Sequence, residues 1–281
     1  MKKIKIICDS LLDLPKELIE ENDICIIPLT VNFEGVEYID GIDITKQQFY
    51  KMLRESKDLP KTSQVTYMTF KDTFEKYIAQ GYSILYIGGS SNASGTYQSS
   101  VMARNDIEGN IYTYDSSLLS LGIGILALQA AKLARENKEI EEIVKELDKI
   151  KEKISVIFTV DTLEYLQKGG RVSMTKATIG NLLNIKPILN ISNGTVAPKS
   201  QVRGKKQVIG KMIELLKEEC KSNIENTEVI IGCGDNQEEL EIVKEKVKEL
   251  GISNIISVNI GSCICAHTGP GVIGMAYYSK N

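Results

Sequence analysis

Short apolar runs alternate with amphipathic segments through the first half of the chain. Residues 4–8, 84–87 and 110–114 are rich in β-prone residues, and each run predicts a buried strand. Residues 24–33 predict a further strand, in which Pro28 favours a bend or an edge position. Segments with a mixed apolar and charged pattern separate these runs and predict helices, including one over 46–56 that Thr45 can cap. Alternating strands and helices indicate a parallel sheet with helices on its faces.

The pattern changes in the second half of the chain. Residues 154–160 predict a strand, and helical pieces are expected around Gly169-Gly170-Arg171. A hairpin follows, with Asn193-Gly194 in a turn of the I′ type. The remaining pattern predicts helices over 205–223 and 237–250 and strands over 227–233, 254–259 and 272–278. We therefore expect an α/β protein of two domains, a parallel α/β domain over 1–153 and a mixed α+β domain over 154–281.

The stretch from Tyr82 to Ala103 combines a strand, a polar loop and the start of a helix. Five hydroxyl side chains follow Gly88-Gly89, namely Ser90, Ser91, Ser94, Thr96 and Tyr97. The loop of such a βα unit lies at the carboxyl end of its strand, where open α/β sheets bind ligands. Because the segment from Gly88 to Ser100 contains no charged residue or histidine, it suits a carboxylate better than a phosphate. A helix cap at Ser94 or Thr96 explains the same residues equally well.

Two other polar clusters come at similar places along the chain. Asp9-Ser10 closes the first strand, and we expect Asp9 to cap the next turn rather than to act in catalysis. Thr62-Ser63 precedes a helix, which Ser63 or Thr66 can cap. The alternative is that Thr62 and Ser63 converge with Ser94 on one small polar group of a ligand.

Two motifs in the sequence are discounted. Residues 122–127 match the dinucleotide pattern G-x-G-x-x-A, but the preceding strand ends several residues upstream and no acidic strand end follows about 20 residues later. Cys263 and Cys265 with His267, the only histidine, lack a convincing fourth metal ligand nearby, so we expect buried thiols on a strand. No metal or other cofactor is predicted.

Composition and charge narrow the possible partners. The 281 residues carry a formal net charge of -3, and lysines are interleaved with acidic residues, so no basic face for nucleic acid is predicted. No apolar run approaches the roughly 20 residues of a membrane span, and the N-terminal apolar run is too short for a signal peptide. We expect reduced thiols and a cytoplasmic location.

Several motifs run in order over nearly the whole chain, and together they are specific. They are Asp9-Ser10 with Asp13-Leu14-Pro15, Asp40-Gly41 with Asp43-Ile44, Thr62-Ser63-Gln64, Ser90-Ser91 with the run from Ser94 to Ser99, Asp115-Ser116, the runs from Leu163 to Leu166 and from Lys168 to Arg171, the run from Asn184 to Pro187, and His267 with Gly269-Pro270-Gly271. With these motifs the chain resembles the DegV family of bacterial lipid-binding proteins.

The resemblance implies a long-chain fatty acid bound between two domains. It assigns the carboxylate to Thr62 and Ser94, and it places His267 and Arg171 near the same rim. Ser63, Ser91, Gly95 and Thr96 are then further head-group or rim residues. The family resemblance also implies a partner, a separate kinase that phosphorylates the bound carboxylate with ATP, and it associates Arg203 with that encounter.

The chain departs from the family pattern at three places. Ala93 stands where a branched apolar residue is usual, Gly88-Gly89 replaces a bulkier pair, and Val65 stands where proline is common. Smaller residues beside the head group are expected to widen the site. The resemblance therefore leaves the preferred chain length and unsaturation open.

A serine hydrolase is the alternative to a carrier. Ser94 would be the nucleophile, His267 the base, and Asp9 or Asp115 the residue that orients the base. The motif G-x-S-x-G is absent around Ser94, which disfavours this mechanism. No Walker A motif or protein-kinase loop set is present either. We therefore expect a lipid-binding subunit that is not catalytic by itself.

Overall fold

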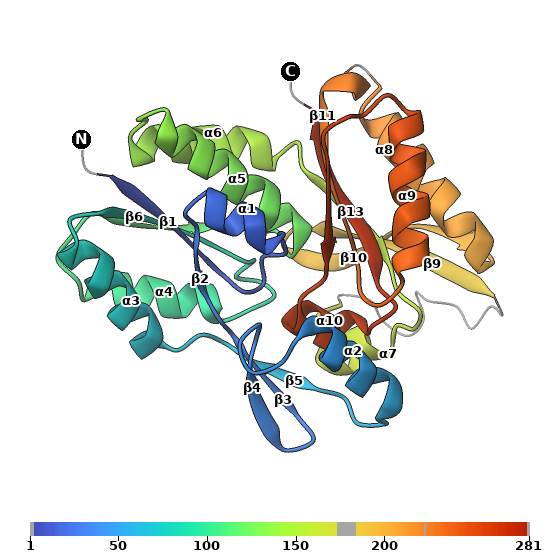
Figure 1. The fold of residues 1–281 in the computed structure, drawn as a ribbon, viewed down its shortest axis with the longest axis horizontal. Helices are drawn as coiled ribbons and strands as arrows, with labels where there is room; N and C mark the ends of the chain where they lie inside the picture. Colours follow the sequence, from blue (N-terminus) through green and yellow to red (C-terminus); the bar gives the residue numbers. More distant parts are fainter. Residues whose placement is uncertain (1–2, 173–183, 222, 280–281) are drawn as a thin grey trace.

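The computed structural model describes residues 3–172, 184–221 and 223–279 (Figure 1). Its first sheet is parallel throughout, with the strand order β2-β1-β6-β7. These strands are β1 (Ile4–Asp9), β2 (Cys25–Ile27), β6 (Ser83–Gly88) and β7 (Ile111–Asp115). Every residue of β6 is buried, as expected for a central strand of a sheet that is covered on both faces. The predicted parallel α/β half is confirmed.

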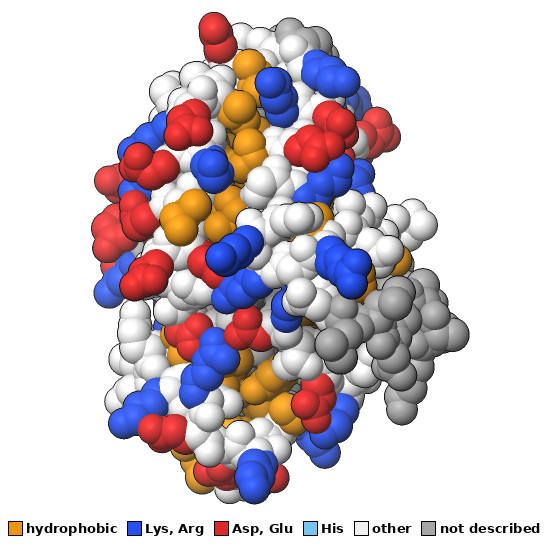
Figure 2. All heavy atoms as spheres, turned by 90° about the vertical axis from the view of Figure 1, so that its right-hand side faces the viewer, with side chains coloured by type: hydrophobic (Ala, Val, Ile, Leu, Met, Phe, Trp, Pro, Cys, Tyr) orange, Lys and Arg blue, Asp and Glu red, His pale blue; other side chains and the backbone are white. Residues whose placement is uncertain are grey.

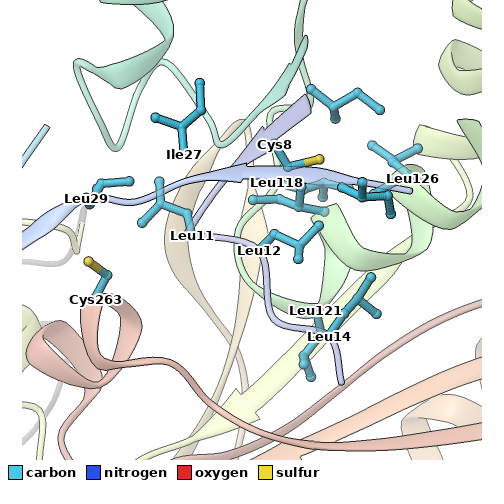
Figure 3. Close-up of a cluster of buried hydrophobic side chains, with 14 of the residues drawn as sticks. Cys8, Leu11, Leu12, Leu14, Ile27, Leu29, Leu118, Leu121, Leu126 and Cys263 are labelled. Carbon is cyan, nitrogen blue, oxygen red and sulfur yellow. The ribbon is translucent and has the colours of Figure 1, made fainter. Parts of the chain in front are cut away.

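Helices cover both faces of this sheet. Figure 1 shows α3 (Tyr67–Ala79) and α4 (Thr96–Asn105) on one face and α5 (Leu121–Arg135), with α6 (Ile140–Lys151) beside it, on the other. The short α1 (Lys16–Glu21) begins directly after Pro15. Leucines of the loop after β1 pack among leucines at the start of α5, as Figure 3 shows: Leu11, Leu12 and Leu14 with Leu118, Leu121 and Leu126. This apolar contact fixes the loop after β1 against α5.

A small antiparallel sheet forms where a single strand was expected over 24–33. That expectation is wrong, because the chain leaves the parallel sheet at Pro28-Leu29 and enters a second sheet of order β4-β3-β5. The Leu29 N–H donates to Ser10 Oγ at 3.0 Å instead of to a neighbouring strand. The strands are β3 (Thr30–Phe33), β4 (Val36–Ile39) and β5 (Lys61–Ser63). The polar cluster at Thr62-Ser63 therefore lies on a strand, and not on a loop.

Between β4 and β5 lies α2 (Lys46–Glu55), whose predicted cap is confirmed. Thr45 Oγ1 accepts from the Gln48 N–H, and the Gln48 side chain accepts from the Thr45 N–H, which completes a capping box. Thr66, rather than Ser63, caps α3 by accepting from the Thr69 N–H.

The second half of the chain builds a mixed sheet of order β10-β9-β8-β13-β11-β12. Only the pair β11 and β12 is parallel among its described strands. The strands are β8 (Ser155–Thr159), β9 (Ile185–Ser192), β10 (Thr195–Arg203), β11 (Thr227–Cys233), β12 (Ile255–Asn259) and β13 (Ile273–Ser279). Asn193 and Gly194 have φ angles of 49° and 75°, so the predicted I′ turn is confirmed.

The helices of this half are α7 (Glu164–Gly169), α8 (Val208–Glu219), α9 (Gln237–Glu249) and α10 (Ser262–Thr268), with short 3-10 turns at Lys205–Gln207 and Ile224–Asn226. Any helical piece predicted within 173–183 lies outside the described residues. The division into domains at residue 153 stays a prediction. Figure 2 shows basic and acidic side chains alternating over one face of the molecule. Ion pairs of opposite charges occur on α8 and α9, such as Lys211 with Glu214 and Lys244 with Glu241.

Cys263, Cys265 and His267 lie on α10, so the expectation of a strand here is wrong. The run Cys-Ile-Cys-Ala-His is short and carries no periodic pattern that separates a buried helix from a buried strand. Both thiols are buried and free, as expected. No group of three or more metal-ligating side chains occurs within the described ranges. None of the helices in that part of the chain is long and apolar enough to cross a membrane.

Candidate functional site

A cavity lies between the parallel sheet and the mixed sheet. It encloses about 810 Å³ of space, which includes the open solvent at its mouth. Most of its wall is aliphatic or aromatic. The first half of the chain supplies Leu11, Leu29, Leu119 and Leu121, and the second half supplies Val156, Phe158, Ile191, Ile260, Ile264 and Val272. A cavity of this kind suits an apolar ligand.

Four polar side chains from separate elements meet at this cavity. Thr62 comes from β5, Ser94 from the loop before α4, Arg171 from the segment after α7, and His267 from α10. Thr62 Oγ1 lies 2.8 Å from His267 Nε2, although 205 residues separate them in the chain. The fold therefore places both predicted carboxylate ligands and two of the predicted rim residues, Arg171 and His267, around one cavity.

Ser94 lies two residues before α4, whose N-cap residue is Gly95. The N-cap position therefore belongs to neither Ser94 nor Thr96, so the alternative of a helix cap at one of these residues is wrong. Ser94 Oγ still accepts from the first helical N–H, that of Thr96, at 3.2 Å, and the Ser94 hydroxyl donates to Thr96 Oγ1 at 3.0 Å. A hydroxyl hydrogen rotates freely, so Ser94 can donate instead to an acceptor that enters the cavity.

The loop that bears Ser94 is tied to the strand that bears Thr62. Gln64 Nε2 donates to Ser99 Oγ at 3.0 Å, and the Val65 N–H donates to Thr96 Oγ1 at 3.3 Å. A side chain at position 95 would overlap the Gln64 amide, so only glycine allows this approach. These contacts fix Thr62 and Ser94 relative to each other.

The remaining predicted residues lie outside the cavity wall. Ser63 and Ser91 are exposed, and Gly95 is exposed beside Gln64. Thr96 is buried, and its hydroxyl accepts from the Ser94 hydroxyl and from the Val65 N–H. Arg203 is exposed at the end of β10. These positions leave Thr62, Ser94, Arg171 and His267 as the predicted residues that face the cavity.

His267 is neutral at physiological pH. Burial is the main cause that lowers its pKa, and the nearby Arg171 guanidinium lowers it further, to about 4. Gly169 packs so closely against the imidazole that a Cβ there would lie 2.5 Å from its Nδ1. His267 Nδ1 is buried and has no hydrogen-bond partner among the described residues. The imidazole therefore acts through Nε2, which holds the Thr62 hydroxyl.

Arg171 joins the second half of the chain to the Ser94 loop. Its guanidinium donates to the Gly169 carbonyl at 2.6 Å and to the Ala93 carbonyl at 3.3 Å. Among the described residues that line the cavity, Arg171 is the only one with a permanent charge. It is exposed, so it adds positive potential at the mouth without requiring a buried ion pair.

The carboxylates proposed for a hydrolase do not orient His267. Asp9 is buried and accepts from the Tyr86 hydroxyl at 2.5 Å and from the Leu11 N–H at 2.9 Å. Asp115 accepts from the Ser117 N–H at 2.8 Å. With Nδ1 of His267 unpaired and Ser94 bonded to Thr96, the geometry does not support the hydrolase mechanism.

The expectation that Gly88-Gly89 widens the site is also wrong. A Cβ at Gly88 would lie 2.8 Å from the Tyr86 ring, and a Cβ at Gly89 would lie 2.7 Å from Leu11 Cδ1. Neighbouring side chains therefore already fill the volume that the two glycines leave. Ala93, in contrast, does line the cavity.

Sequence reasoning missed Ser120, which also lines the cavity. Its hydroxyl donates to Asp13 Oδ2 at 2.6 Å, and its backbone has a φ of 54°. Ser120 is a polar residue directly before the largely apolar α5, which begins at Leu121, so its position was a usable signal.

We predict that acid destabilises the protein through His267. Its pKa falls from 6.5 in the unfolded chain to about 4 in the fold, so the unfolded chain binds the proton more readily between these values. The free energy of unfolding then decreases as the pH falls through this window, by about 3 kcal/mol for a shift of 2.5 units. Denaturant unfolding at a series of pH values measures this effect.

The control is His267→Gln, which keeps a polar side chain beside Thr62 and does not titrate. Asp13 has a pKa raised to about 6 by burial, so it acts in the opposite direction, but it is present in both proteins and cancels in the comparison. Equal acid dependence of the two proteins would contradict the prediction.

The comparisons with known proteins agree with this architecture. The family model described as "Uncharacterised protein, DegV family" matches residues 3–280. A DegV domain-containing protein of Clostridium acetobutylicum is 38% identical over 281 residues, with 100% of both chains covered.

Two solved structures are close to this fold. A DegV family protein of Thermus thermophilus, reported for its fatty acid binding, superposes with a TM-score of 0.92 at 29% identity, over 99% of this chain and 100% of the other. A stearic acid-binding protein of Eubacterium ventriosum superposes with a TM-score of 0.91 at 29% identity, over 100% of this chain and 99% of the other. The expected fold is confirmed.

Proposed function

The chain belongs to the DegV family, and from that premise we propose that it binds one long-chain fatty acid in the cavity between its two main sheets. The observation that carries the proposal is an apolar cavity with Thr62, Ser94 and His267 gathered on its wall and Arg171 beside them. A fatty acid presents the matching chemistry, a long apolar tail and one carboxylate.

The carboxylate is held by the hydroxyls of Thr62 and Ser94. The Thr62 hydroxyl has one proton to give to the carboxylate, so His267 donates to Thr62 Oγ1 from Nε2, and since the imidazole is neutral it adds no charge. Arg171 supplies the positive potential that offsets desolvation of the carboxylate. Thr96 supports this head-group site through its bonds to Ser94 and Val65, whereas Ser63, Ser91 and Gly95 lie on the exposed rim around it and make no contact with the carboxylate. No cofactor is needed for binding.

The tail supplies most of the affinity. Burial of one methylene contributes about 0.8 kcal/mol, so a tail of about 14 methylenes has an upper limit near 11 kcal/mol before the costs of ordering. The aliphatic wall from both halves of the chain is the surface that receives it.

The protein presents the bound acid to a separate fatty acid kinase. In this reaction a carboxylate oxygen attacks the γ-phosphorus of ATP, an acyl phosphate forms, and ADP leaves. Because ATP is the co-substrate, we place this encounter in the cytoplasm. Arg203 lies seven residues along β10 from the cavity residue Val196, about 23 Å at 3.3 Å per residue. This distance separates Arg203 from the cavity, and its exposure supports the proposal that it contacts the kinase.

We predict that Arg203→Glu separates the two roles. Delipidated protein with this substitution is expected to take up labelled oleate one to one, as the unchanged protein does. Conversion of the bound oleate to acyl phosphate by a fatty acid kinase and ATP is expected to fall by about tenfold, because a charge at an interface rim mainly lowers the association rate. Lys217→Glu, which reverses an exposed charge on α8, is the control. Loss of oleate uptake, or unchanged conversion, would contradict the assignment.

A further inference from the structure

One face of α2 reaches across to the second half of the chain. Lys46, Tyr50 and Arg54 are spaced by four residues, so they lie above one another on a single side of the helix. Lys46 Nζ donates to the Asn259 carbonyl at 2.5 Å, and the Tyr50 hydroxyl donates to the Ile260 carbonyl. These two carbonyls directly precede α10, the helix that bears His267.

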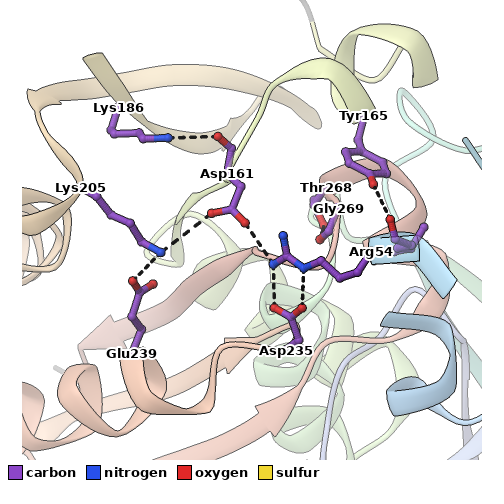
Figure 4. Close-up of polar contacts among 10 residues, drawn as sticks. Arg54, Asp161, Tyr165, Lys186, Lys205, Asp235, Glu239, Thr268 and Gly269 are labelled. Atoms are coloured by element: carbon purple, nitrogen blue, oxygen red, sulfur yellow. Dashed lines mark hydrogen bonds and ion pairs between the residues drawn. The ribbon is translucent and has the colours of Figure 1, made fainter. Parts of the chain in front are cut away.

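Arg54, at the far end of α2, binds two acids of the second half (Figure 4). Its guanidinium makes a bidentate contact with Asp235, at 2.7 Å and 2.9 Å, and a third bond of 3.1 Å with Asp161. Bidentate bonds of this kind fix the geometry of both partners. Lys205 continues the network to Glu239 at 2.8 Å.

Asp235 and Asp161 both contact the turn that follows α10. The Asp235 N–H donates to the Pro270 carbonyl at 2.8 Å, and the Asp161 carboxylate covers Gly271 so closely that no side chain fits there. On the other side of the turn, the Tyr165 ring packs against Gly269, and its hydroxyl donates to the Leu53 carbonyl of α2 at 3.4 Å. The chain is thus attached to α2 on both sides of α10, before the helix begins and after it ends.

We propose that α2 is a splint that positions His267 against Thr62, and that Arg54 is its principal positioning residue. Thr62 follows α2 on β5, whereas His267 lies on α10, so the 2.8 Å contact between them depends on how α2 docks on the second half. The oleate measurement in the test below rests on the proposed function, whereas the contact between His267 and Thr62 does not. Because the Arg54 side chain is 48% exposed, salt weakens the splint.

The test compares Arg54→Gln with Lys51→Gln. Lys51 lies on the same helix and pairs with Glu55 on its exposed side, so its substitution removes the same charge without touching the second half. His267 is the only histidine, so its imidazole signals in NMR spectra report this one site. In Arg54→Gln the pKa of His267 is expected to rise by about one unit, since a loosened site admits water. Oleate is expected to dissociate about tenfold faster.

A second variant keeps the test independent of folding. Asp235→Asn removes the bidentate partner from the opposite half and is expected to reproduce both changes. At a salt concentration near 1 M the Debye length is about 3 Å. The pKa of His267 and the oleate dissociation rate of the unchanged protein should then approach the values of Arg54→Gln, whereas the values of that variant should not change. Unchanged His267 titration in Arg54→Gln and Asp235→Asn, or an equal shift in Lys51→Gln, would overturn the splint. If the unchanged protein binds no oleate, but the pKa of His267 still differs between it and Arg54→Gln, the splint is retained and the proposed function is refuted.

Discussion

Combining Thr62→Val with Ser94→Ala is expected to weaken oleate binding by between about 100-fold and 1,000-fold. Hydrogen bonds to a charged group contribute about 1.5–3 kcal/mol each, and 1.4 kcal/mol corresponds to a factor of ten. Each single variant should therefore lose roughly thirtyfold. The double variant reaches the upper figure only if the losses add, and two donors to one carboxylate rarely act independently. Valine keeps the shape of Thr62 while it removes the hydroxyl that His267 holds.

The matched control combines Ser63→Ala with Ser91→Ala. These hydroxyls are neighbours of the first pair in the chain, but they are exposed and do not line the cavity. Their loss is expected to change the affinity by less than about threefold. Titration of delipidated protein with oleate measures the affinities of the unchanged protein, the two single variants, the double variant and the control. Equal affinity of the double variant and its control would contradict the assignment of the carboxylate to Thr62 and Ser94.

Leu119→Trp is expected to weaken binding of an 18-carbon acid by about a hundredfold. Leu119 lines the cavity and is only partly buried, so an indole there enters the cavity without overpacking the core. Displacing about four methylenes of the tail costs roughly 3 kcal/mol at 0.8 kcal/mol each. A ten-carbon acid leaves more of the cavity empty and should lose much less. Since the chain has no tryptophan, the indole fluorescence also reports binding directly.

Met102→Trp is the control for that substitution. Met102 is 53% exposed on α4 and lies outside the cavity, so its indole should leave both acids unaffected. If Leu119→Trp lowered the affinity for the two acids equally, the tail would not pass Leu119. If it lowered neither, the cavity would not be the tail site.

The parallel half and its polar loops followed from local patterns. β6 is a short apolar run closed by two glycines, and the hydroxyls after it have no role in a core, so the loop at the strand end was recognisable. The predicted turn at Asn193-Gly194 had a similar local cause, because both residues tolerate positive φ. Such features depend on a few neighbouring residues.

Features set by distant contacts could not be derived in this way. The contact between Thr62 and His267 joins residues 205 positions apart, and only the family resemblance suggested that they meet. α10 is helical in a segment without helical periodicity, because its sides contact α2, α7 and the small sheet. Pro28 signalled a bend, but no local property of residues 24–33 shows that the two halves enter different sheets.

The splint was hidden for the same reason. Lys46, Tyr50 and Arg54 resemble an ordinary solvated helix face, and the partners of Arg54 are Asp161 and Asp235, more than 100 residues away. The volume beside Gly89 was misjudged because Leu11, which fills it, comes from the loop after β1. Sequence patterns locate polar loops, whereas packing decides which residues face the cavity.

Mass spectrometry of solvent-extracted protein tests the central claim most directly. The protein is purified without denaturant, and the ligand that leaves with the solvent is identified and compared in amount with the protein. The account predicts a near-stoichiometric long-chain fatty acid, held by the apolar wall and the Thr62, Ser94, Arg171 and His267 cluster. A protein that is empty after purification and that also fails to take up added oleate or palmitate would contradict it.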